Sequence, residues 1–519
     1  MNFTAFSEAF ARQGGKFAFG VPGGGPSLAL VDALSKQGAQ FITTGHETTA
    51  ALMAGAVVRQ TGAPSLAVTI KGPGFANLAP GLLANAYEGL PMLSISEAYD
   101  TAKPGPRRHK WLDHARLAGE FLKSCRAFSS SPGFFESCLT EARTEFPGPV
   151  QVDLVESGAL PNAPLPSTPA DDPKEIFSAL RAAQRPALVV GSLGVRAAWR
   201  GQFGALRVPV FTTPAAKGVL AEDGPFAAGI YTGDGKPATP EKKLVPQADL
   251  VLMLGVRPGE ILNPAAPHAR TLWVETAEVR DRAVFPPLQP GPTRSFLSPA
   301  TIAEVLTELA KHEWGADLVA KAHAELQRAL DRWPWATARL LQVAQTVLPD
   351  ATHVLDTGNF TVVGEHCLRA RHERQILGTP NGRYLGLGIG YALGAAAAAV
   401  AGRQPVVLWI GDGGLRAFFS ELSLAAEQRW PLLVLVMRDG WFGSVRGRAE
   451  SQGWTRTPLV MAERNFPAVA ERMGLASGRV TNEGEFTRWL EAWSRQPGPA
   501  LLECVLDADA YNQQAELLR

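Results

Sequence analysis

The sequence is poor in cysteine and nearly balanced in charge, and both features exclude classes of protein. Its four cysteines, Cys125, Cys138, Cys367 and Cys504, form no CxxC pair and no zinc-finger spacing. This argues against a disulfide framework or a structural zinc site and favours reduced thiols in a cytoplasmic protein. The formal net charge of +1 gives no electrostatic reason to expect binding to nucleic acid or to an anionic membrane.

Long apolar runs are also lacking. The most apolar stretch, Ala392–Ala401, is too short to span a bilayer, and its alanines suit tight helix packing. The first residues, MNFTAFSEAFARQGGKF, contain no apolar core of a signal peptide. We therefore expect a cytoplasmic protein without a membrane partner.

Hydrophobic residues nevertheless make up 46% of the 519 positions, which is enough for more than one core. Short apolar strands alternate with helical patterns along most of the chain, which is typical of parallel α/β domains. Proline-rich segments at 156–173 and 286–299 interrupt this alternation. We predict three α/β domains at 1–160, 173–311 and 335–519.

The segment 409–443 is the most informative part of the chain. An apolar strand precedes Gly411-Asp412-Gly413, and a second apolar strand precedes Arg438-Asp439-Gly440, with a helical pattern between them. The carboxyl ends of parallel strands are where cofactors bind, and glycines there allow backbone to approach a phosphate. Two carboxylates at that edge suit a Mg²⁺ ion that also holds diphosphate oxygens. The alternative is an ordinary turn whose aspartates cap helices.

Asp412 and Asp439 lie 27 positions apart. This spacing resembles the diphosphate–Mg²⁺ motif of thiamine diphosphate (ThDP) enzymes, specifically the acetolactate synthase, benzoylformate decarboxylase and pyruvate decarboxylase group. The resemblance implies that both aspartates and the backbone carbonyl of Trp441 ligate Mg²⁺. The chain departs from the family's Asn-Asn pair at Arg438-Asp439, which places an extra anion beside the diphosphate; Arg438 is a candidate to offset it.

The same resemblance implies further cofactor-binding residues, both in the glycine turn of this motif and earlier, at the start of the third domain. These candidates are Gly411, Asp412, Gly413, Gly414, Gly358 and Asn359.

A second region, 41–98, resembles the pyrimidine-binding domain of the same group. The matching residues are Gly45-His46-Glu47, Gly72-Pro73-Gly74 and Asn77-Leu78. Glu47 falls on the glutamate that activates the cofactor: its carboxylate would hydrogen bond to the aminopyrimidine and promote removal of the thiazolium C2 proton. The alternative reading is a helix N-terminal glutamate favoured by the helix dipole.

A third match is Gly386–Tyr391. The resemblance implies that the backbone around Leu387 hydrogen bonds to the aminopyrimidine and that Ile389 props the cofactor into a bent shape. A buried helix start would produce the same pattern, and both interpretations can hold together.

Candidates for the substrate side are less specific. His46 adjoins Glu47, and His109 and Lys110 occupy a stretch that lies near the active site in relatives, so we assign all three as candidate catalytic residues. Arg446 and Arg448 follow the predicted metal site and could pair with a substrate carboxylate. Each of these basic residues could instead be solvated surface.

Together these features predict a ThDP- and Mg²⁺-dependent enzyme that acts on a small anionic 2-oxo acid. The resemblance implies three Rossmann-like domains: the first binds the pyrimidine, the second is the central domain, and the third binds the diphosphate. The enzyme is a decarboxylase or an acetolactate synthase-like carboligase, since both use the same residues. The alternatives are a 2-hydroxyacyl-CoA or oxalyl-CoA lyase, and a catalytically impaired ThDP-binding paralogue.

Two further expectations concern partners and a second cofactor. Glu47 and Asp412 lie in different domains yet must contact opposite ends of one cofactor, and in this family the domains come from different chains. We therefore expect a homodimer or homotetramer with shared active sites. The central segment resembles a domain that helps to hold FAD in acetolactate synthases. Its glycine turn at 191–196 is explained by a strand–helix connection, so we expect no FAD.

Overall fold

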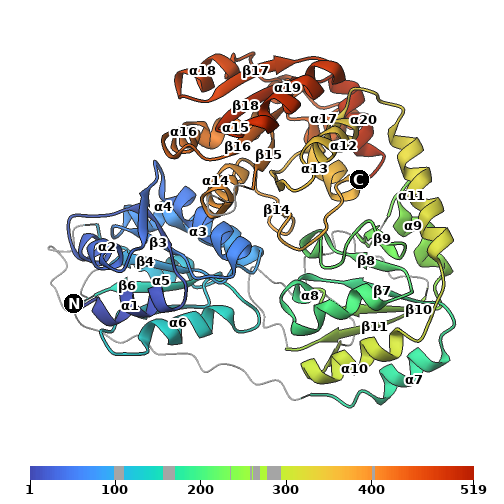
Figure 1. Ribbon diagram of the computed structural model, residues 1–519, viewed down its shortest axis with the longest axis horizontal. Helices are drawn as coiled ribbons and strands as arrows, with labels where there is room; N and C mark the ends of the chain where they lie inside the picture. Colours follow the sequence, from blue (N-terminus) through green and yellow to red (C-terminus); the bar gives the residue numbers. More distant parts are fainter. Residues whose placement is uncertain are drawn as a thin grey trace.

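The computed structural model describes residues 1–98, 110–155, 170–233, 235–257, 260, 269–277, 294–399 and 404–519. These residues form three six-stranded sheets. Every pairing of neighbouring strands in them is parallel. Figure 1 shows the sheets as three lobes: the N-terminal domain in blue, the central domain in green, and the C-terminal domain in orange and red. The predicted fold class, three α/β domains with parallel sheets, is confirmed.

The N-terminal sheet has the strand order β2-β1-β3-β4-β6-β5. Its inner strands β3, β4 and β6 are buried along their whole length, as expected for a parallel sheet covered by helices on both faces. The elements are α1 (Thr4–Arg12), β1 (Phe17–Val21), α2 (Pro26–Lys36), β2 (Gln40–Thr43), α3 (Glu47–Thr61), β3 (Leu66–Thr69), α4 (Pro73–Tyr87), β4 (Leu93–Glu97), α5 (His114–Ala118), β5 (Ser124–Ala127), α6 (Phe134–Arg143) and β6 (Val150–Leu154).

The central sheet has the order β12-β11-β10-β7-β8-β9. Counted within the domain this is 6-5-4-1-2-3, the order of dinucleotide-binding Rossmann folds. The elements are α7 (Lys174–Ala182), β7 (Pro186–Val190), α8 (Ser192–Arg196), η2 (Ala198–Ala205), β8 (Val210–Thr212), η3 (Pro214–Ala216), β9 (Ala227–Ile230), α9 (Pro240–Leu244), η4 (Val245–Gln247), β10 (Leu250–Leu254), β11 (Arg270–Glu275), β12 (Arg294–Phe296) and α10 (Pro299–Leu309), where η denotes a 3₁₀ helix.

The C-terminal sheet has the order β14-β13-β15-β16-β18-β17. After α11 (Ala316–Leu330), its elements are α12 (Thr337–Val347), β13 (Thr352–Leu355), α13 (Asn359–Cys367), β14 (Ile376–Gly378), α14 (Gly388–Ala399), β15 (Val406–Gly411), α15 (Asp412–Phe418), η5 (Phe419–Leu422), α16 (Ser423–Gln428), β16 (Leu432–Arg438), α17 (Gly443–Ser451), η6 (Thr457–Leu459), α18 (Phe466–Arg472), β17 (Ala476–Val480), α19 (Glu483–Arg495), β18 (Ala500–Val505) and α20 (Ala508–Glu516).

The N-terminal and C-terminal sheets share one topology, which the sequence alone did not reveal. Counted within each domain, both have the strand order 2-1-3-4-6-5. In both, the order reverses between the first and third strands, namely between β1 and β3 and between β13 and β15. Open parallel sheets bind ligands in the crevice at such a reversal, outside the carboxyl ends of the strands.

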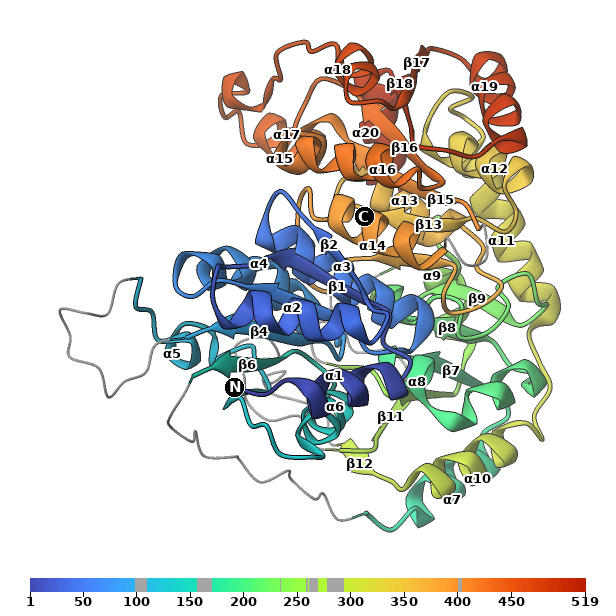
Figure 2. The same ribbon diagram turned by 60° about the vertical axis from the view of Figure 1, so that its left-hand side comes forward.

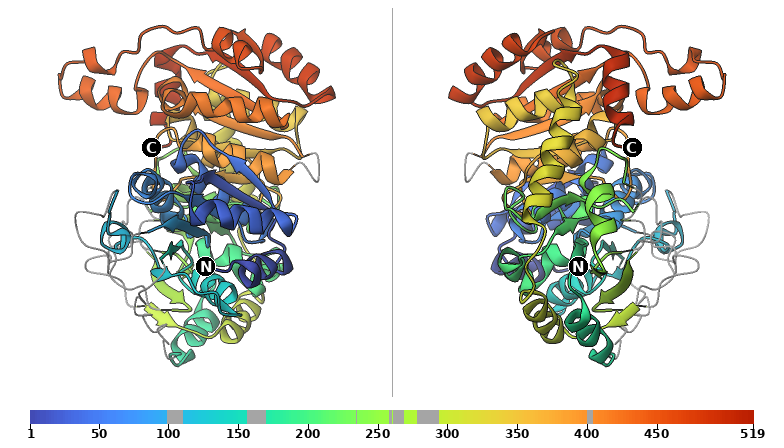
Figure 3. Two further views of the ribbon diagram at one scale, coloured as in Figure 1. Left: turned by 90° about the vertical axis from the view of Figure 1, so that its left-hand side faces the viewer. Right: turned by 90° about the vertical axis from the view of Figure 1, so that its right-hand side faces the viewer.

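Helices α3 and α14 join these two domains. Small residues let the helices approach closely: a Cβ built on Gly390 would lie 2.6 Å from Cβ of Leu52, and one on Gly394 would lie 2.5 Å from the Met53 carbonyl oxygen. Their apolar residues belong to one core cluster that spans both domains. Figures 1 and 2 both show α3 and α14 side by side, and the side views of Figure 3 show the C-terminal domain above the other two.

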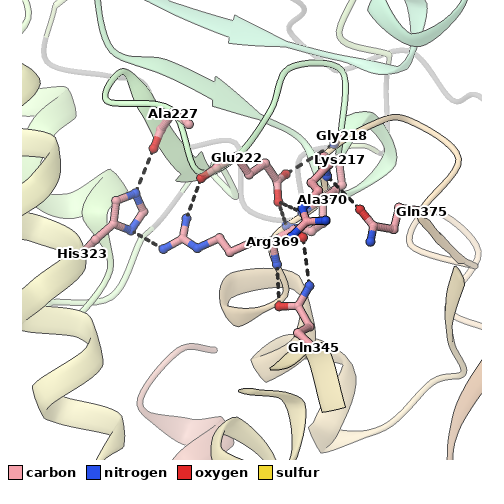
Figure 4. Close-up of polar contacts among 10 residues, drawn as sticks. Lys217, Gly218, Glu222, Ala227, His323, Gln345, Arg369, Ala370 and Gln375 are labelled. Carbon is pink, nitrogen blue, oxygen red and sulfur yellow. Dashed lines mark hydrogen bonds and ion pairs between the residues drawn. The ribbon is translucent and has the colours of Figure 1, made fainter. Parts of the chain in front are cut away.

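A buried polar cluster joins the central and C-terminal domains (Figure 4). The Glu222 carboxylate accepts hydrogen bonds from Lys217 Nζ at 2.8 Å and from the Ala370 N–H at 2.9 Å. Beside it, Arg369 donates a hydrogen bond to His323 Nδ1 at 2.9 Å. These hydrogen bonds join residues of the central domain, helix α11 and the C-terminal domain. They hold the central domain against the C-terminal domain.

Two expectations from composition can be compared with the structure. All four cysteines are free thiols, and burial raises the pKa of Cys367 to about 12. Within the described ranges, no helix is both long and apolar enough to cross a membrane.

Candidate active site

Asp412 and Asp439 lie at the carboxyl ends of two neighbouring strands. Strands β15 and β16 pair in parallel up to Gly411 and Met437, so each aspartate follows its strand at the same edge. The Asp412 carboxylate accepts a hydrogen bond from the Gly440 N–H at 3.0 Å, and the Asp439 carboxylate accepts one from the Trp441 N–H at 3.2 Å. The two predicted turns therefore lie side by side at the carboxyl edge of the sheet, and the hydrogen bond between Asp412 and Gly440 connects them.

The electrostatics of this edge favour a cation. Burial, followed by repulsion from Asp439, raises the pKa of Asp412 to about 7. Burial also raises the pKa of Asp439 to about 6. Asp439 Oδ2 is buried and accepts no hydrogen bond from any described residue. A hard divalent cation would ligate this oxygen and remove the repulsion between the carboxylates.

The donor set fits Mg²⁺ better than a metal held entirely by side chains. No three His, Cys, Asp or Glu side chains in the described part of the chain cluster closely enough to hold a metal ion. Mg²⁺ keeps several waters and commonly uses one or two carboxylates together with substrate phosphates. Asp412, Asp439 and the Trp441 carbonyl are residues that could hold it in this way.

Glycines around Asp412 leave room only for backbone. A Cβ on Gly413 would lie 2.9 Å from the Phe442 ring, and one on Gly414 would lie 2.4 Å from Asp356 Oδ2. Gly411 is the last residue of β15 and precedes the helix that starts at Asp412. This edge can therefore present backbone amides to an anion.

Asp356 belongs to the same edge, and sequence reasoning missed it. It follows β13 and accepts hydrogen bonds from the N–H groups of Gly386 at 3.0 Å and Gly388 at 2.9 Å. Burial raises its pKa to about 7. Asp356 thus fixes the loop before α14, which contains Leu387. The spacing between Asp356 and these glycines matches no local motif.

Helix α13 starts at the same edge with two predicted cofactor-binding residues. The Gly358 N–H donates to Thr361 Oγ1 at 2.9 Å. The buried Asn359 side chain donates to Asn512 Oδ1 at 3.1 Å and accepts from Arg519 at 2.9 Å. Asn512 and Arg519 are a further pair of residues that the sequence patterns did not indicate.

Leu387 and Ile389 lie where α14 begins. Both are buried, and the Leu387 carbonyl accepts a hydrogen bond from the Gly390 N–H at 3.1 Å. Ile389 packs in the core cluster between α3 and α14. The helix-start interpretation of this motif therefore holds, and a role of Ile389 toward a cofactor stays a prediction.

Glu47 is the first residue of α3, and its buried carboxylate is held by two side chains. Asn77 Nδ2 donates to one carboxylate oxygen at 3.0 Å, and Thr69 Oγ1 lies 3.5 Å from the other. His46 is the N-cap of this helix, with Nδ1 accepting from the Thr48 N–H at 3.1 Å. His46 thus has a structural role at its Nδ1 atom.

The start of α3 contacts the C-terminal domain of the same chain. The Gly45 N–H donates to the Glu421 carboxylate at 3.1 Å, and the rings of His46 and Phe418 lie 5.7 Å apart. Burial raises the pKa of Glu421, and the charge of Glu47 raises it further. The structure thus brings Glu47 next to the domain that carries Asp412; sharing of the site between two chains stays a prediction.

The predicted basic residues are placed differently from one another. His109 lies outside the described residues. Lys110 is exposed, and its carbonyl lies against Gly72, where a Cβ would approach to 2.1 Å. Arg438 is paired with Glu503 at 3.3 Å and also with Glu463, and its positive charge partly opposes the rise in the pKa of Asp412.

Arg446 is also engaged. It pairs with Glu450 at 2.9 Å and Asp509 at 2.6 Å, and its guanidinium lies 4.6 Å from the Trp441 ring centroid. Two carboxylates therefore already neutralise this side chain, and it is poorly suited to bind a substrate carboxylate.

In the central domain, a carboxylate of the protein itself occupies the crevice where strand order reverses. Glu260 accepts hydrogen bonds from the Ser192 N–H at 2.9 Å and from Thr213 Oγ1 at 2.8 Å. In Rossmann folds the N–H groups after the first strand bind a dinucleotide diphosphate. Here one such group, the Ser192 N–H, already donates to Glu260.

Comparison with known proteins agrees with this geometry. Models of three domains of thiamine pyrophosphate enzymes match in order: the N-terminal TPP binding domain at 3–117, the central domain at 174–280, and the C-terminal TPP binding domain at 356–504. The chain belongs to the thiamine diphosphate-dependent enzymes. The family predicted from the GDG and GHE motifs is thus confirmed, and Glu47 and Asp412 lie in the two TPP binding domains.

Several decarboxylases and acetolactate synthases are similar over nearly the whole chain. A probable 2-ketoarginine decarboxylase of Pseudomonas aeruginosa is 26% identical, covering 96% of this chain and 93% of the relative. The acetolactate synthase of Bacillus subtilis is 26% identical over 98% of this chain and 94% of the relative. The large subunit of acetolactate synthase isozyme 1 of Escherichia coli is 24% identical over 96% and 92%.

Proposed function

We propose that this protein is a ThDP- and Mg²⁺-dependent enzyme that breaks or forms the carbon–carbon bond next to the carbonyl of a 2-oxo acid. The observation that carries this proposal is the placement of Glu47. A buried carboxylate is oriented by Asn77 and Thr69 at the end of α3 that contacts the C-terminal TPP binding domain. A carboxylate held in this way suits proton transfer rather than surface solvation.

ThDP, when bound, supplies a thiazolium ring that accepts electrons as carbon dioxide leaves the 2-oxo acid. The chain's own contribution is positional and electrostatic. Glu47 would hold a proton shared with the aminopyrimidine N1′ atom. The hydrogen bond from Asn77 fixes one carboxylate oxygen, so that the other remains in a constant orientation.

Asp412, Asp439 and the Trp441 carbonyl would hold Mg²⁺, and Gly411, Gly413, Gly414, Gly358 and Asn359 would line the diphosphate. The orphaned Asp439 Oδ2 and the raised pKa values of both carboxylates support this assignment. Leu387, fixed by Asp356 through its flanking glycines, would contact the aminopyrimidine with its backbone.

The enzyme needs no flavin on this proposal. The reaction is redox-neutral, and the Ser192 N–H that would meet a dinucleotide diphosphate already donates to Glu260. Absorbance of the purified protein near 450 nm tests this point: a stoichiometric flavin band would contradict it.

The substrate is a small anionic 2-oxo acid. The relatives include a probable 2-ketoarginine decarboxylase and acetolactate synthases, which supports decarboxylation followed by either protonation or capture of an acceptor. The functional unit is a homodimer or homotetramer in the cytoplasm. Light scattering during turnover tests the oligomer, because a fully active monomer would contradict a shared site.

A turnover screen tests the function. Purified protein with ThDP and Mg²⁺ is assayed against a panel of 2-oxo acids, with carbon dioxide and the organic products identified. The Glu47→Gln variant should lose activity by orders of magnitude, whereas Glu120→Gln, an exposed control, should match the parent. Equal activity of parent and Glu47→Gln would refute the proposal, and an adenine-nucleotide dependence would favour an acyl-CoA lyase.

A further inference from the structure

A cavity of about 620 Å³ lies where the three domains meet, and we call it the junction cavity. Its lining comes from the ends of α3, α4 and α6, from α8, η2 and η3, and from residues 373–374 of the C-terminal domain. In Figures 1 and 2, α8 lies on the side of the central domain that faces the N-terminal domain. Since α3 rises about 1.5 Å per residue, the cavity is roughly 20 Å from Glu47, which starts this helix, and is separate from the candidate active site.

The junction cavity is rich in arginine, and three of its arginines are paired. Arg196 forms an ion pair with Glu145 at 2.9 Å. Arg200 and Arg374 share Glu373, at 2.6 Å and 3.8 Å. Two carboxylates therefore serve three guanidinium groups.

Two more arginines line the same cavity without a carboxylate partner. Within the described residues, neither Arg59 nor Arg143 forms an ion pair, and Arg59 donates no hydrogen bond. Arg143 donates one hydrogen bond, to the Gly62 carbonyl at 2.9 Å. Burial lowers the pKa of Arg59 to about 10, with the charge of Glu373 acting in the opposite direction. Arg59 is therefore still charged at pH 7, and its partly buried guanidinium lacks a counterion.

Glu88 lines the cavity but does not supply this counterion. Its carboxylate accepts hydrogen bonds from the N–H groups of Asn381 at 3.1 Å and Gly382 at 3.2 Å. Burial raises the pKa of Glu88 to about 8, so the group is mostly protonated at pH 7. The junction cavity therefore keeps a surplus of positive charge.

The other lining residues limit the class of anion. The described part of the lining contains aliphatic side chains such as Val58, Leu90 and Val195, and no aromatic ring on which a nucleotide base or a flavin would stack. The Ser192 N–H at its rim already donates to Glu260. Guanidinium groups match phosphate and carboxylate oxygens bidentately, and a cavity of this size accommodates a small metabolite.

We propose that the junction cavity binds a small aliphatic polyanion, carrying phosphate or carboxylate groups, with Arg59 and Arg143 as its counterions. These two arginines belong to the N-terminal domain, whereas the paired arginines belong to the other two domains. One bound anion is thus attracted by all three domains and stabilises their docking. The proposal goes beyond the proposed function and does not depend on it, because the cavity shares no residue with the ThDP site.

Anion binding to the full chain tests the proposal. Calorimetric titrations use protein saturated with ThDP and Mg²⁺, so that the probe does not enter the diphosphate site. The probe 3-phosphoglycerate, which carries a phosphate and a carboxylate, should bind with a dissociation constant below about 1 mM and raise the midpoint of thermal unfolding. Glycerol, its uncharged analogue, should do neither. Succinate separates the two anion types: equal affinity assigns carboxylate recognition, and weaker binding assigns phosphate recognition.

Variants locate the bound anion. Arg59→Gln and Arg143→Gln should each weaken 3-phosphoglycerate about tenfold, the size of one charge-assisted contact. Arg59→Lys keeps the charge and should stay within about threefold of the parent. The control is Arg495→Gln, an exposed arginine at the end of α19, which should leave the constant unchanged. Arg143→Gln alone decides the result if the variants at position 59 do not fold.

Three outcomes would overturn the proposal. Absence of binding for both 3-phosphoglycerate and succinate would exclude a polyanion site. Equal affinity of the parent, Arg59→Gln and Arg143→Gln would place the bound anion elsewhere on the protein. Equal binding of glycerol would show that charge is irrelevant. None of these measurements uses turnover, so their failure leaves the proposed enzyme activity intact, and an inactive enzyme leaves this proposal intact.

Discussion

Acid should loosen the docking of the central and C-terminal domains through His323. The His323 Nε2–H donates to the Ala227 carbonyl at 2.8 Å, and Nδ1 accepts from Arg369 at 2.9 Å (Figure 4). Only the neutral ring can satisfy both partners, because a protonated imidazole has no acceptor for the guanidinium. Burial, followed by the charge of Arg369, lowers the pKa of His323 from 6.5 to about 4.

The size and sign of the effect follow from this shift. Between pH 6.5 and pH 4 the unfolded chain binds a proton at His323 that the folded chain does not bind. The contribution to the free energy of unfolding is therefore complete above pH 6.5 and is lost as the pH falls toward 4. A shift of this size corresponds to about 3 kcal/mol, since one pKa unit is worth about 1.4 kcal/mol.

The assay compares urea unfolding of the parent and His323→Gln at several pH values between 4 and 7. Glutamine can also donate to Ala227 and accept from Arg369, yet it does not titrate. The parent should lose about 3 kcal/mol more than the variant across this range. The control is His312→Gln, which removes a histidine outside this cluster. Parallel pH dependence of parent and His323→Gln would refute the reasoning.

Three further predictions concern other parts of the molecule. Gly394→Ala should destabilise the chain by about 3 kcal/mol, because its Cβ would lie 2.5 Å from the Met53 carbonyl oxygen, whereas Gly498→Ala, with open space around it, should be neutral in thermal unfolding. Asn77→Ala should lower kcat about tenfold with little change in ThDP affinity, because it frees the Glu47 carboxylate; a change in affinity alone would contradict this. Removal of Mg²⁺ with EDTA should release ThDP, and retention of ThDP in gel filtration would contradict the metal assignment.

The sequence predicted the parts of this molecule that are encoded locally. Strand, glycine turn and helix follow one another within a few residues at Gly411–Gly414, so the position of Asp412 at a strand end could be read directly. Asp439 follows the next apolar strand in the same way, and the structure pairs the two strands. The short-range pattern therefore located this edge.

Contacts between distant segments could not be read in this way. Asp356 accepts hydrogen bonds from the amides of Gly386 and Gly388. Arg519 donates to Asn359, although the two residues lie near opposite ends of the domain's sequence. No spacing rule links such positions, because the fold alone brings them together. Counting basic residues was also misleading: Arg446 looks available in the sequence, but its guanidinium is already paired with two carboxylates.

The N-terminal and C-terminal domains show why topology alone does not assign a site. Both have the same strand order, and both place an acidic residue at the end of a strand near the point of reversal. In the N-terminal domain, Glu97 at the end of β4 accepts hydrogen bonds from Ser27 Oγ at 2.7 Å and Lys71 Nζ at 3.4 Å, so its charge is satisfied by the protein. In the C-terminal domain, Asp439 keeps a buried oxygen that no described donor reaches. The charge at this edge is therefore satisfied by the protein in one domain and left with a free buried oxygen in the other, and this difference supports the proposed Mg²⁺ site at the C-terminal edge.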